Sequence, residues 1–515
     1  MVKTGSIYLI LLILITLNAR ANDAGTLLVE PWYEGRTPDT LYVALGRLAA
    51  AGVIEYPLMC PRPYMRGYVI ELLEKGDIGG EGLSPADRWY LRRLADEFGV
   101  ELGTETPNEL GERRLFYETY EERVTAYIDV YGTGGGYYRR GTDSYLKSGI
   151  IIDDGLEYGE RFAIRQRTKI FGFSGRDYVP EYIDRARIIL KTGTYVDPYI
   201  IYASFGWPNI SFQFGRDQME TGPGYHNQLL LSRNAPALDM FRFTLSFPRA
   251  DWTAITARLE PADNRYLSLH GFVIRLFPWV DVGVSEAVIY QDDSFPSIYL
   301  NPFLPYYIEQ NFRGDKDNML IAAGLDFHLP LGVRLYGEYL TDGGMFSSRR
   351  DLEPFEKRGL LVGTYLPLTI ANRPLDLRSE YTNVRNGVYS HKFDGNEYSY
   401  MGIPLGSYTG PDADEFWLWG GFRYWPNFET SAEITLRRKG EGDLSPKSYW
   451  SKDSFLTGVV EREKELAAGF LWENIFRFGA LQTKVGYMWT ENYEHEQGRD
   501  RNFFWADVQG AVGWM

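Results

Sequence analysis

Residues 123–132 read RVTAYIDVYG, and apolar and polar side chains alternate along the whole stretch. The apolar positions are Val124, Ala126, Ile128 and Val130, and the polar positions are Arg123, Thr125, Tyr127 and Asp129. Because successive side chains of a β-strand point to opposite faces, this pattern predicts a strand with one apolar and one polar face. The stretch therefore indicates a sheet whose two faces meet different surroundings.

The same alternation recurs as far as the C-terminus. It is clear in SAEITLR (431–437), ELAAGFLWE (465–473) and WADVQGAVGWM (505–515). Counting such segments from about residue 116 gives roughly 16 to 18, many of them about 9–11 residues long, the length of a tilted membrane-spanning strand. The polar face carries charge in strand after strand, without a blade-length repeat, which argues against a soluble sandwich or propeller. We therefore predict an all-β transmembrane barrel of about 18 antiparallel strands.

The composition agrees with a barrel. The chain of 515 residues contains 38 Tyr, 29 Phe, 13 Trp and 54 Gly. Tyr and Trp are enriched where a barrel crosses the two membrane–water interfaces, whereas the lumen is polar. The connections also differ in length. A short turn at Gly332 and Val333 contrasts with long polar stretches near 291–318, 341–358, 385–414 and 438–463, which we expect to be extracellular loops.

The first residues predict export. Lys3 is followed by an apolar run over residues 7–17 and then by small residues that end at Ala21. This order is typical of a secretory signal, and the run is shorter than the roughly 20 apolar residues that a spanning helix needs. We predict a signal peptide over residues 1–21 that is cleaved after about Ala21.

The pattern between Thr37 and Gly99 is helical. Short amphipathic stripes predict three helices, and in the third Ser84 is the cap and Pro85 the first helical residue. Three such helices make a small bundle. We expect residues 22–112 to form a periplasmic helical plug or cap, and residues 113–515 to form the barrel.

The sequence contains few signs of catalysis or metal binding. A net charge of −15 argues against nucleic acid as a partner. Cys60 is the one cysteine, and the five histidines show neither metal-ligand spacing nor an HExxH motif. There is no G-x-S-x-G nucleophile motif, and neighbouring carboxylates such as Asp153 and Asp154 diverge on a strand. We therefore predict a protein that is not an enzyme and has no cofactor and no metal site.

One stretch departs from the strand pattern. Residues 212–236 read FQFGRDQMETGPGYHNQLLLSRNAP, in which an amphipathic strand opens into Gly-Pro-Gly and ends on a Leu run. Glycine and proline there allow a tight turn at a strand end. The polar residues of this stretch that are candidates for contact with a ligand are Arg216, Asp217, Tyr225, Arg233 and Asn234. The alternative is that this motif only stabilises a bent wall or an inward-folded loop.

Two stretches resemble the signatures of the Wzi-type capsule assembly proteins of the outer membrane. The first comprises Gly222, Pro223, Gly224, Leu230, Ser232, Asn234 and Ala235. The second comprises Asn301, Pro302, Glu309, Gln310, Asn311, Asp317, Asn318, Gly324, Asp326, Tyr336, Gly337, Glu338 and Asp342. Family members often have Trp before the Gly-Pro-Gly, where this chain has Thr221.

The resemblance implies an 18-stranded barrel in the outer membrane whose periplasmic end is occluded by the helical bundle. It also implies lectin-like attachment of capsular or exopolysaccharide at the cell surface. The implied partners are this polysaccharide, outer-membrane lipid and the polysaccharide export machinery. The sequence leaves two other functions open. The second hypothesis is a porin-like diffusion channel, and the third is a surface hydrolase.

Overall fold

The computed structural model describes residues 40–59, 61–76, 83–98, 116–120, 124–139, 144–159, 161–175, 188–189, 194–207, 209–259, 264–291, 299–312, 316–343, 357–449, 451, 455–475 and 479–514. The predicted signal peptide, and the boundary predicted between residues 112 and 113, lie outside these residues. The division of the chain into signal, bundle and barrel therefore stays a prediction at those limits.

Five helices lie in the described part of the chain. They are α2 (Thr40–Ala50), α3 (Arg66–Lys75), α4 (Pro85–Phe98), α7 (Tyr306–Phe312) and α8 (Pro446–Tyr449). The strands are β1 (Phe116–Tyr120), β2 (Val124–Arg139), β3 (Tyr145–Tyr158), β4 (Phe162–Gly175), β5 (Ile188–Ile189), β6 (Thr194–Trp207), β7 (Ile210–Asp217), β8 (Leu238–Phe247), β9 (Ala250–Arg258), β10 (Arg265–Phe277), β11 (Val280–Gln291), β12 (Asn318–His328), β13 (Arg334–Asp342), β14 (Arg358–Ile370), β15 (Arg373–Val384), β16 (Ser399–Tyr400), β17 (Ile403–Pro404), β18 (Ala413–Trp425), β19 (Phe428–Lys439), β20 (Glu461–Ile475), β21 (Gly479–Glu491) and β22 (Arg501–Trp514).

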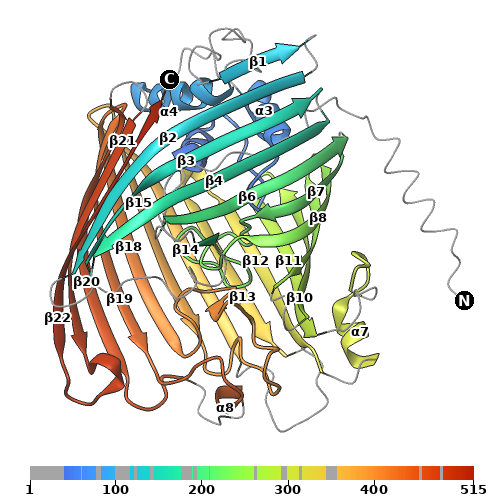
Figure 1. The fold of residues 1–515 in the computed structure, drawn as a ribbon, viewed down its shortest axis with the longest axis vertical. Coiled ribbons are helices and arrows are strands. Elements are labelled where there is room, and N and C mark those ends of the chain that lie inside the picture. Colours follow the sequence, from blue (N-terminus) through green and yellow to red (C-terminus); the bar gives the residue numbers. More distant parts are fainter. Residues whose placement is uncertain are drawn as a thin grey trace, which may run out of the picture.

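The strands close into an antiparallel barrel (Figure 1). Long strands that follow one another along the chain pair with each other, and the ring closes where β22 pairs with β2. The short β1 and β5 occupy stretches of strand edge on β2 and β6, and β16 and β17 form a separate pair. The remaining 18 strands are the wall, which confirms the predicted fold class.

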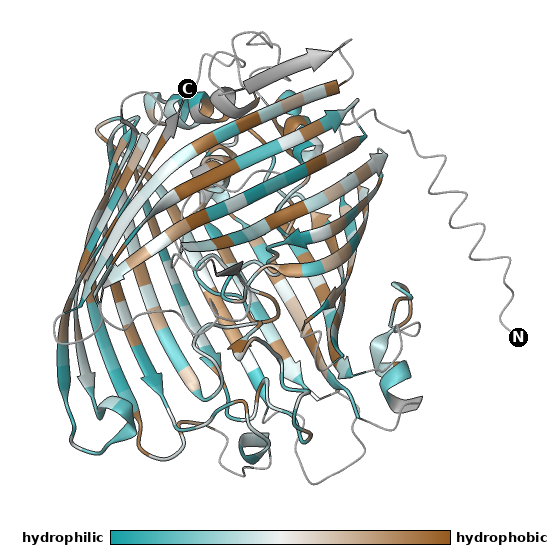
Figure 2. Cartoon of the chain, viewed as in Figure 1, coloured by the Kyte–Doolittle hydropathy of each residue, from teal (hydrophilic) through white to brown (hydrophobic). Residues whose placement is uncertain are grey.

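The apolar faces of the strands point outward, as the alternation predicts (Figure 2). On β19, Ile434 and Leu436 are 38% and 45% exposed, and on β21 Val485 and Trp489 are 40% and 43% exposed. A closed barrel with an apolar outer belt can contact lipid because every strand of its ring has two paired edges.

The N-terminal helices form as their sequence predicts. The Ser84 Oγ accepts the backbone N–H of Asp87 at 3.1 Å, so Ser84 caps α4, and Pro85 is the first residue of that helix. Thr37, where the helical pattern begins, lies outside the described residues. Within the described residues, no helix has the length and apolar character needed to cross a membrane.

The helical segment, residues 40–98, packs on the inner wall at the end of the barrel where the turns are short (Figure 1). The Arg47 Nη1 lies 3.2 Å from Asp376 Oδ1 on β15, and the Tyr90 hydroxyl donates to the same carboxylate at 3.0 Å. On other strands, Tyr56 stacks on His328 of β12 with ring centres 4.0 Å apart. The segment therefore contacts several parts of the lumen wall.

The lumen is filled unevenly. Inward side chains of β8 to β15 are almost all buried, and many belong to one apolar cluster. Many inward side chains on β2, β19, β21 and β22, among them Tyr137, Lys484 and Gln509, are only half-buried. We call these two regions of the inner wall the packed side and the open side.

Part of the long connection between β11 and β12 lies outside the barrel. Residues 299–312, which contain α7, lie against the outer face of β10 and β11 and are called the outer strap (Figure 1). The ring of Tyr306 lies 4.2 Å from that of His270, and its backbone N–H donates to Glu286 Oε2 at 2.8 Å. His270 is paired with Glu286 across β10 and β11, and the next pair on the same face, Phe272 and Val284, is exposed. His270 and Glu286 therefore point to the outside of the barrel. The strap therefore covers polar groups on an otherwise apolar wall.

Candidate functional site

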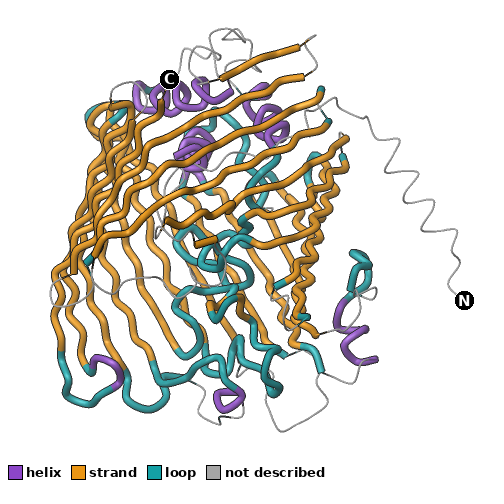
Figure 3. The backbone as a smooth tube through the Cα atoms, viewed as in Figure 1, coloured by secondary structure: helices purple, strands orange, loops and turns teal. Residues whose placement is uncertain are grey.

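The Gly-Pro-Gly stretch belongs to a loop that folds into the barrel. This loop, residues 218–237, joins β7 to β8 and lies between the walls (Figure 3), and we call it the plug loop. Gly222 has φ +87°, a conformation that favours glycine, and a Cβ there would lie 2.9 Å from the carboxylate of Glu338. A Cβ on Gly224 would overlap the carbonyl oxygen of Asn227. Both glycines are thus needed for the path of the loop.

Two carboxylates of the packed side bind the backbone of the plug loop. Glu338 Oε2 on β13 accepts the N–H of Leu229 at 2.8 Å. Glu380 on β15 accepts three successive N–H groups, those of Tyr225 at 2.5 Å, His226 at 3.0 Å and Asn227 at 3.0 Å. Charged acceptors make stronger hydrogen bonds than neutral ones, particularly away from water. These contacts fix the loop inside the lumen.

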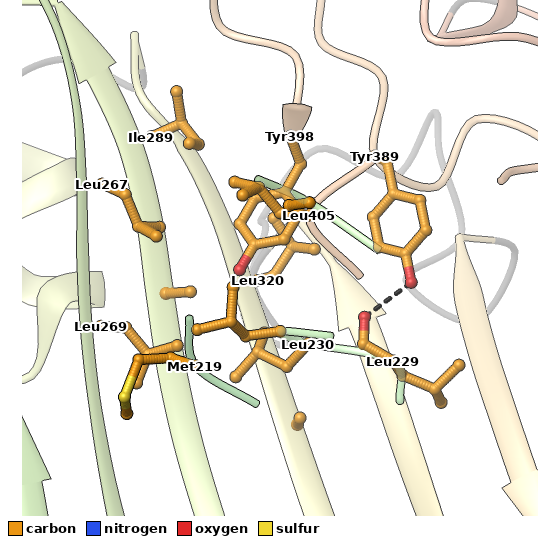
Figure 4. Close-up of a cluster of buried hydrophobic side chains, with 14 of the residues drawn as sticks. Met219, Leu229, Leu230, Leu267, Leu269, Ile289, Leu320, Tyr389, Tyr398 and Leu405 are labelled. Carbon is orange, nitrogen blue, oxygen red and sulfur yellow. Dashed lines mark hydrogen bonds between the residues drawn. The ribbon is translucent and has the colours of Figure 1, made fainter. Parts of the chain in front are cut away.

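The Leu run of the plug loop enters an apolar cluster (Figure 4). Leu229 and Leu230 are fully buried against wall residues such as Leu320. Tyr389 and Tyr398, from the connection between β15 and β18, pack on the other side, and the Tyr389 hydroxyl donates to the Leu229 carbonyl at 2.6 Å. This part of the predicted extracellular loop 385–414 therefore folds inward, and those two rings are buried.

Two of the predicted polar residues lie where β7 ends, on opposite faces. Arg216 forms a double hydrogen bond with Asp239 of β8, at 2.7 and 2.6 Å, on the outer face. Asp217 is buried on the inner face and accepts the Gln213 Nε2 at 2.8 Å. The structure therefore separates Arg216 from the lumen.

Arg233 and Asn234 lie inside the barrel and are bound to other parts of the protein. The Arg233 Nε lies 2.9 Å from Glu220 Oε2. The Asn234 Nδ2 donates to the Pro404 carbonyl at 3.3 Å, beside a hydrogen bond of 2.5 Å from the Ser232 Oγ to the Gly406 carbonyl. The first bond holds two parts of the plug loop together, and the other two join the loop to the inward-folded connection between β15 and β18.

Tyr225 lies between the plug loop and the wall. Its ring faces the guanidinium of Arg378 at 3.9 Å and lies 6.1 Å from the ring of Trp417. Burial raises the pKa of its hydroxyl. Within the described residues, that oxygen has no hydrogen-bond partner. Tyr225 is thus the predicted residue with a polar group left for a further contact, although the group is buried.

The second signature divides between the two faces of the barrel. Tyr336, Gly337 and Glu338 lie on β13, where the Tyr336 hydroxyl donates to Glu380 at 2.7 Å beside the plug loop. Asn301 and Pro302 lie in the outer strap, and Gln310 and Asn311 lie in α7. In the strap, the Gln310 Nε2 donates to the Asp317 carbonyl at 2.8 Å. One half of this signature therefore positions the plug loop, and the other half forms the strap.

Sequence reasoning missed Glu380 and a cluster around His226. The His226 ring stacks on Trp417 with centres 4.3 Å apart, and its Nε2 lies 3.0 Å from Glu415 Oε1. Glu380 and Glu415 have no local motif, and the one available signal is a carboxylate at an inward position of an amphipathic strand. In the part of the chain that the structure describes, no three His, Cys, Asp or Glu side chains form a group suited to a metal ion.

The fold and the site define an outer-membrane β-barrel whose lumen contains a plug loop and a helical segment of its own chain. The family model described as capsule assembly protein Wzi matches residues 142–503, more than two thirds of the sequence, so the chain belongs to that family. Family and fold together place the protein in the outer membrane.

Solved structures resemble this fold at low sequence identity. The structure of Wzi from Escherichia coli, described as a carbohydrate-binding β-barrel involved in group 1 capsule assembly, is 14% identical, with a TM-score of 0.65, and the match covers 94% of this chain and 99% of that one. OccD3 (OpdP) of Pseudomonas aeruginosa is 10% identical, with a TM-score of 0.44, and the match covers 75% and 92%. No curated protein sequence matches the chain.

Proposed function

We propose that this protein binds capsular or exopolysaccharide at the cell surface and so assists capsule assembly, without catalysing a reaction. The observation that carries the proposal is the occupied lumen: Glu338 and Glu380 fix a plug loop across a barrel of the capsule assembly family. A fixed loop suits retention of a polymer better than free passage of solutes. The carbohydrate binding described for the Escherichia coli relative supports the same function.

The predicted contact residues enter this proposal in two roles. Asp217 accepts the first N–H of the plug loop, and Arg233 and Asn234 are also engaged within the protein, so we assign these three to holding the loop. Tyr225 stays a candidate for contact with the glycan, and Arg216 stays one only for glycan outside the lumen, since it pairs with Asp239 on the outer face. Outer-membrane lipid around the apolar belt, and export machinery, complete the proposed partners. Cleavage after Ala21 and a periplasmic location of residues 22–112 belong to the same proposal.

The experiment is binding of the purified barrel in detergent to fluorescently labelled surface polysaccharide from the bacterium that encodes it. We expect saturable binding and unchanged polymer length after prolonged incubation. Shortening of the polymer would instead support a hydrolase. Absence of binding across several polysaccharide preparations would contradict the proposal.

A diffusion channel is the second candidate, and the open side of the lumen is the observation that favours it. Planar-bilayer recording distinguishes the two. A polysaccharide anchor should give small, rare conductance steps, whereas large and stable steps together with no polysaccharide binding would favour the channel.

A further inference from the structure

Five aromatic rings line the inner wall from β22 and β2 of the open side to the neighbouring β3, β4 and β6, near the strand ends that lie away from the helical segment. We call this row the aromatic ladder, and it consists of Trp505 (β22), Tyr137 (β2), Tyr145 (β3), Phe173 (β4) and Tyr195 (β6). All five are half-buried. Their outward neighbours Tyr138 and Phe504 are 50% and 42% exposed on the opposite face of the wall.

The rings of the ladder form one continuous row. Trp505 and Tyr137 stack with centres 6.5 Å apart, and Tyr137 and Tyr145 stack at 5.7 Å. Phe173 follows edge-on at 5.6 Å from Tyr145, and Tyr195 lies 5.6 Å from Phe173. Since neighbouring strands are about 4.8 Å apart, the row runs about 20 Å around the wall. That length exceeds what a single sugar ring would need.

A glycine sets the orientation at one end of the ladder. Gly486 is the direct partner of Trp505 across β21 and β22, and a Cβ on Gly486 would lie 2.5 Å from the Cε2 of that indole. The indole therefore lies over the neighbouring strand, in space that a side chain at position 486 would fill. A flat aromatic face with polar groups beside it is the surface on which the C–H face of a sugar ring stacks.

Polar side chains accompany the ladder. The Lys147 Nζ lies 4.3 Å from the ring centre of Phe171 and 5.8 Å from that of Phe173. Asp507 is directly opposite Tyr137 in the sheet and accepts the Gln509 Nε2 at 3.0 Å. Hydroxyl groups of a sugar require such donors and acceptors around the stacked face. The packed side has no comparable row, because its inward rings, among them Tyr336 and Tyr365, are buried.

We propose that the aromatic ladder is the seat of a polysaccharide chain, whose successive sugar rings stack on it inside the mouth of the barrel. This inference rests on the proposed polysaccharide binding and adds where and how the polymer is held. The plug loop would then determine where the polymer binds, because it fills the packed side of the lumen and so leaves only the opposite wall accessible to the polymer.

The test is the same binding measurement with matched variants of the intact barrel. Tyr137→Ala and Trp505→Ala should each weaken binding of the labelled polysaccharide about tenfold, as the loss of one aromatic platform predicts. Their controls are Tyr138→Ala and Phe504→Ala, which remove a ring from the next residue on the lipid side and should leave binding unchanged. Heat-modifiable mobility on a gel reports whether each variant is folded.

Conservative variants keep the test decisive if an alanine variant does not fold. Tyr137→Phe retains the ring and should bind within about twofold of the unchanged protein, and Trp505→Phe should bind with intermediate affinity. Equal binding by the unchanged protein, Tyr137→Ala and Trp505→Ala would overturn the ladder and leave the proposed function standing. Equal weakening by Tyr138→Ala would also overturn it. If the unchanged protein does not bind, the proposed function itself fails.

Discussion

Glu380 Oε2 on β15 accepts the backbone N–H of Asn227, 153 residues earlier in the chain, at 3.0 Å. Its Oε1 accepts the two preceding N–H groups of the plug loop. A carboxylate is acceptor-only, which suits three converging donors, and hydrogen bonds to charged groups contribute about 1.5–3 kcal/mol each. This side chain is therefore the main polar tie between the plug loop and the wall.

Replacing Glu380 should release the plug loop. In Glu380→Gln the amide presents an N–H₂ group to backbone donors, so at least one of the three bonds is lost. We expect larger and more frequent conductance steps in planar bilayers and faster hydrogen exchange over residues 225–229. The matched control is Glu433→Gln, an inward carboxylate of the open side whose partner is Lys484. Similar conductance in the two variants would contradict this role of Glu380.

A methyl group at Gly224 should prevent the loop from docking. The Cβ of Gly224→Ala would collide with the Asn227 carbonyl, whereas a Cβ on Gly134 of β2 meets no atom within 4 Å. We expect Gly224→Ala to give a barrel with higher conductance or a much lower yield of heat-modifiable protein. Gly134→Ala should behave like the unchanged protein. Normal yield and normal conductance of Gly224→Ala would refute the described path of the loop.

Loss of Asp376 should detach the helical segment from the wall. Asp376→Ala removes the wall carboxylate that binds both the buried Arg47 and the Tyr90 hydroxyl, and breaking a buried ion pair costs about 3–5 kcal/mol. We expect proteases to cleave the variant within residues 40–98 while the barrel stays intact. Glu71→Gln is the control, because its pair with Lys75 is exposed and such pairs contribute about 0–1 kcal/mol. Equal protease resistance would show that the segment is held by other contacts.

The outer strap should lie at the lipid surface. Phe303 and Ile308 are 60% and 43% exposed beside the apolar belt of the wall. In a background lacking Cys60, a spin label at Phe303→Cys should collide more with oxygen, which concentrates in lipid, than with a water-soluble nickel complex. A label at Lys447→Cys, on an exposed position of α8, should show the reverse. Equal access of the nickel complex to both labels would mean that the strap lies in water.

Much of the fold could be predicted from local pattern. Strands were recognisable because most outward positions, such as Ile434 and Leu436, are apolar, and Ser84 marked the start of α4. The inward path of the plug loop could not be predicted, since it depends on Glu338 and Glu380, which lie more than 100 residues from the loop in the sequence. The sequence left two roles open for the motif.

The outer strap and the ladder escaped prediction for related reasons. His270 and Glu286 occupy lipid-facing positions, and nothing near them in sequence indicates that Tyr306 covers them. Tyr137 and Trp505 look like two of many aromatics until the β2–β22 pairing makes them neighbours. The local alternation of apolar and polar residues determines whether a side chain points into or out of the barrel. Which side chains it then contacts depends on strands that are distant in the sequence.

The seam between β2 and β22 also bears on how the protein is made. Every wall strand other than β2 and β22 pairs with the wall strands that precede and follow it in the chain, whereas β2 pairs with β22, the strand synthesised last. Until then the sheet has two open edges, which readily pair with other chains. Pairing of β22 with β2 is thus the step that removes both open edges at once and ends the exposure of the unfinished sheet to other chains.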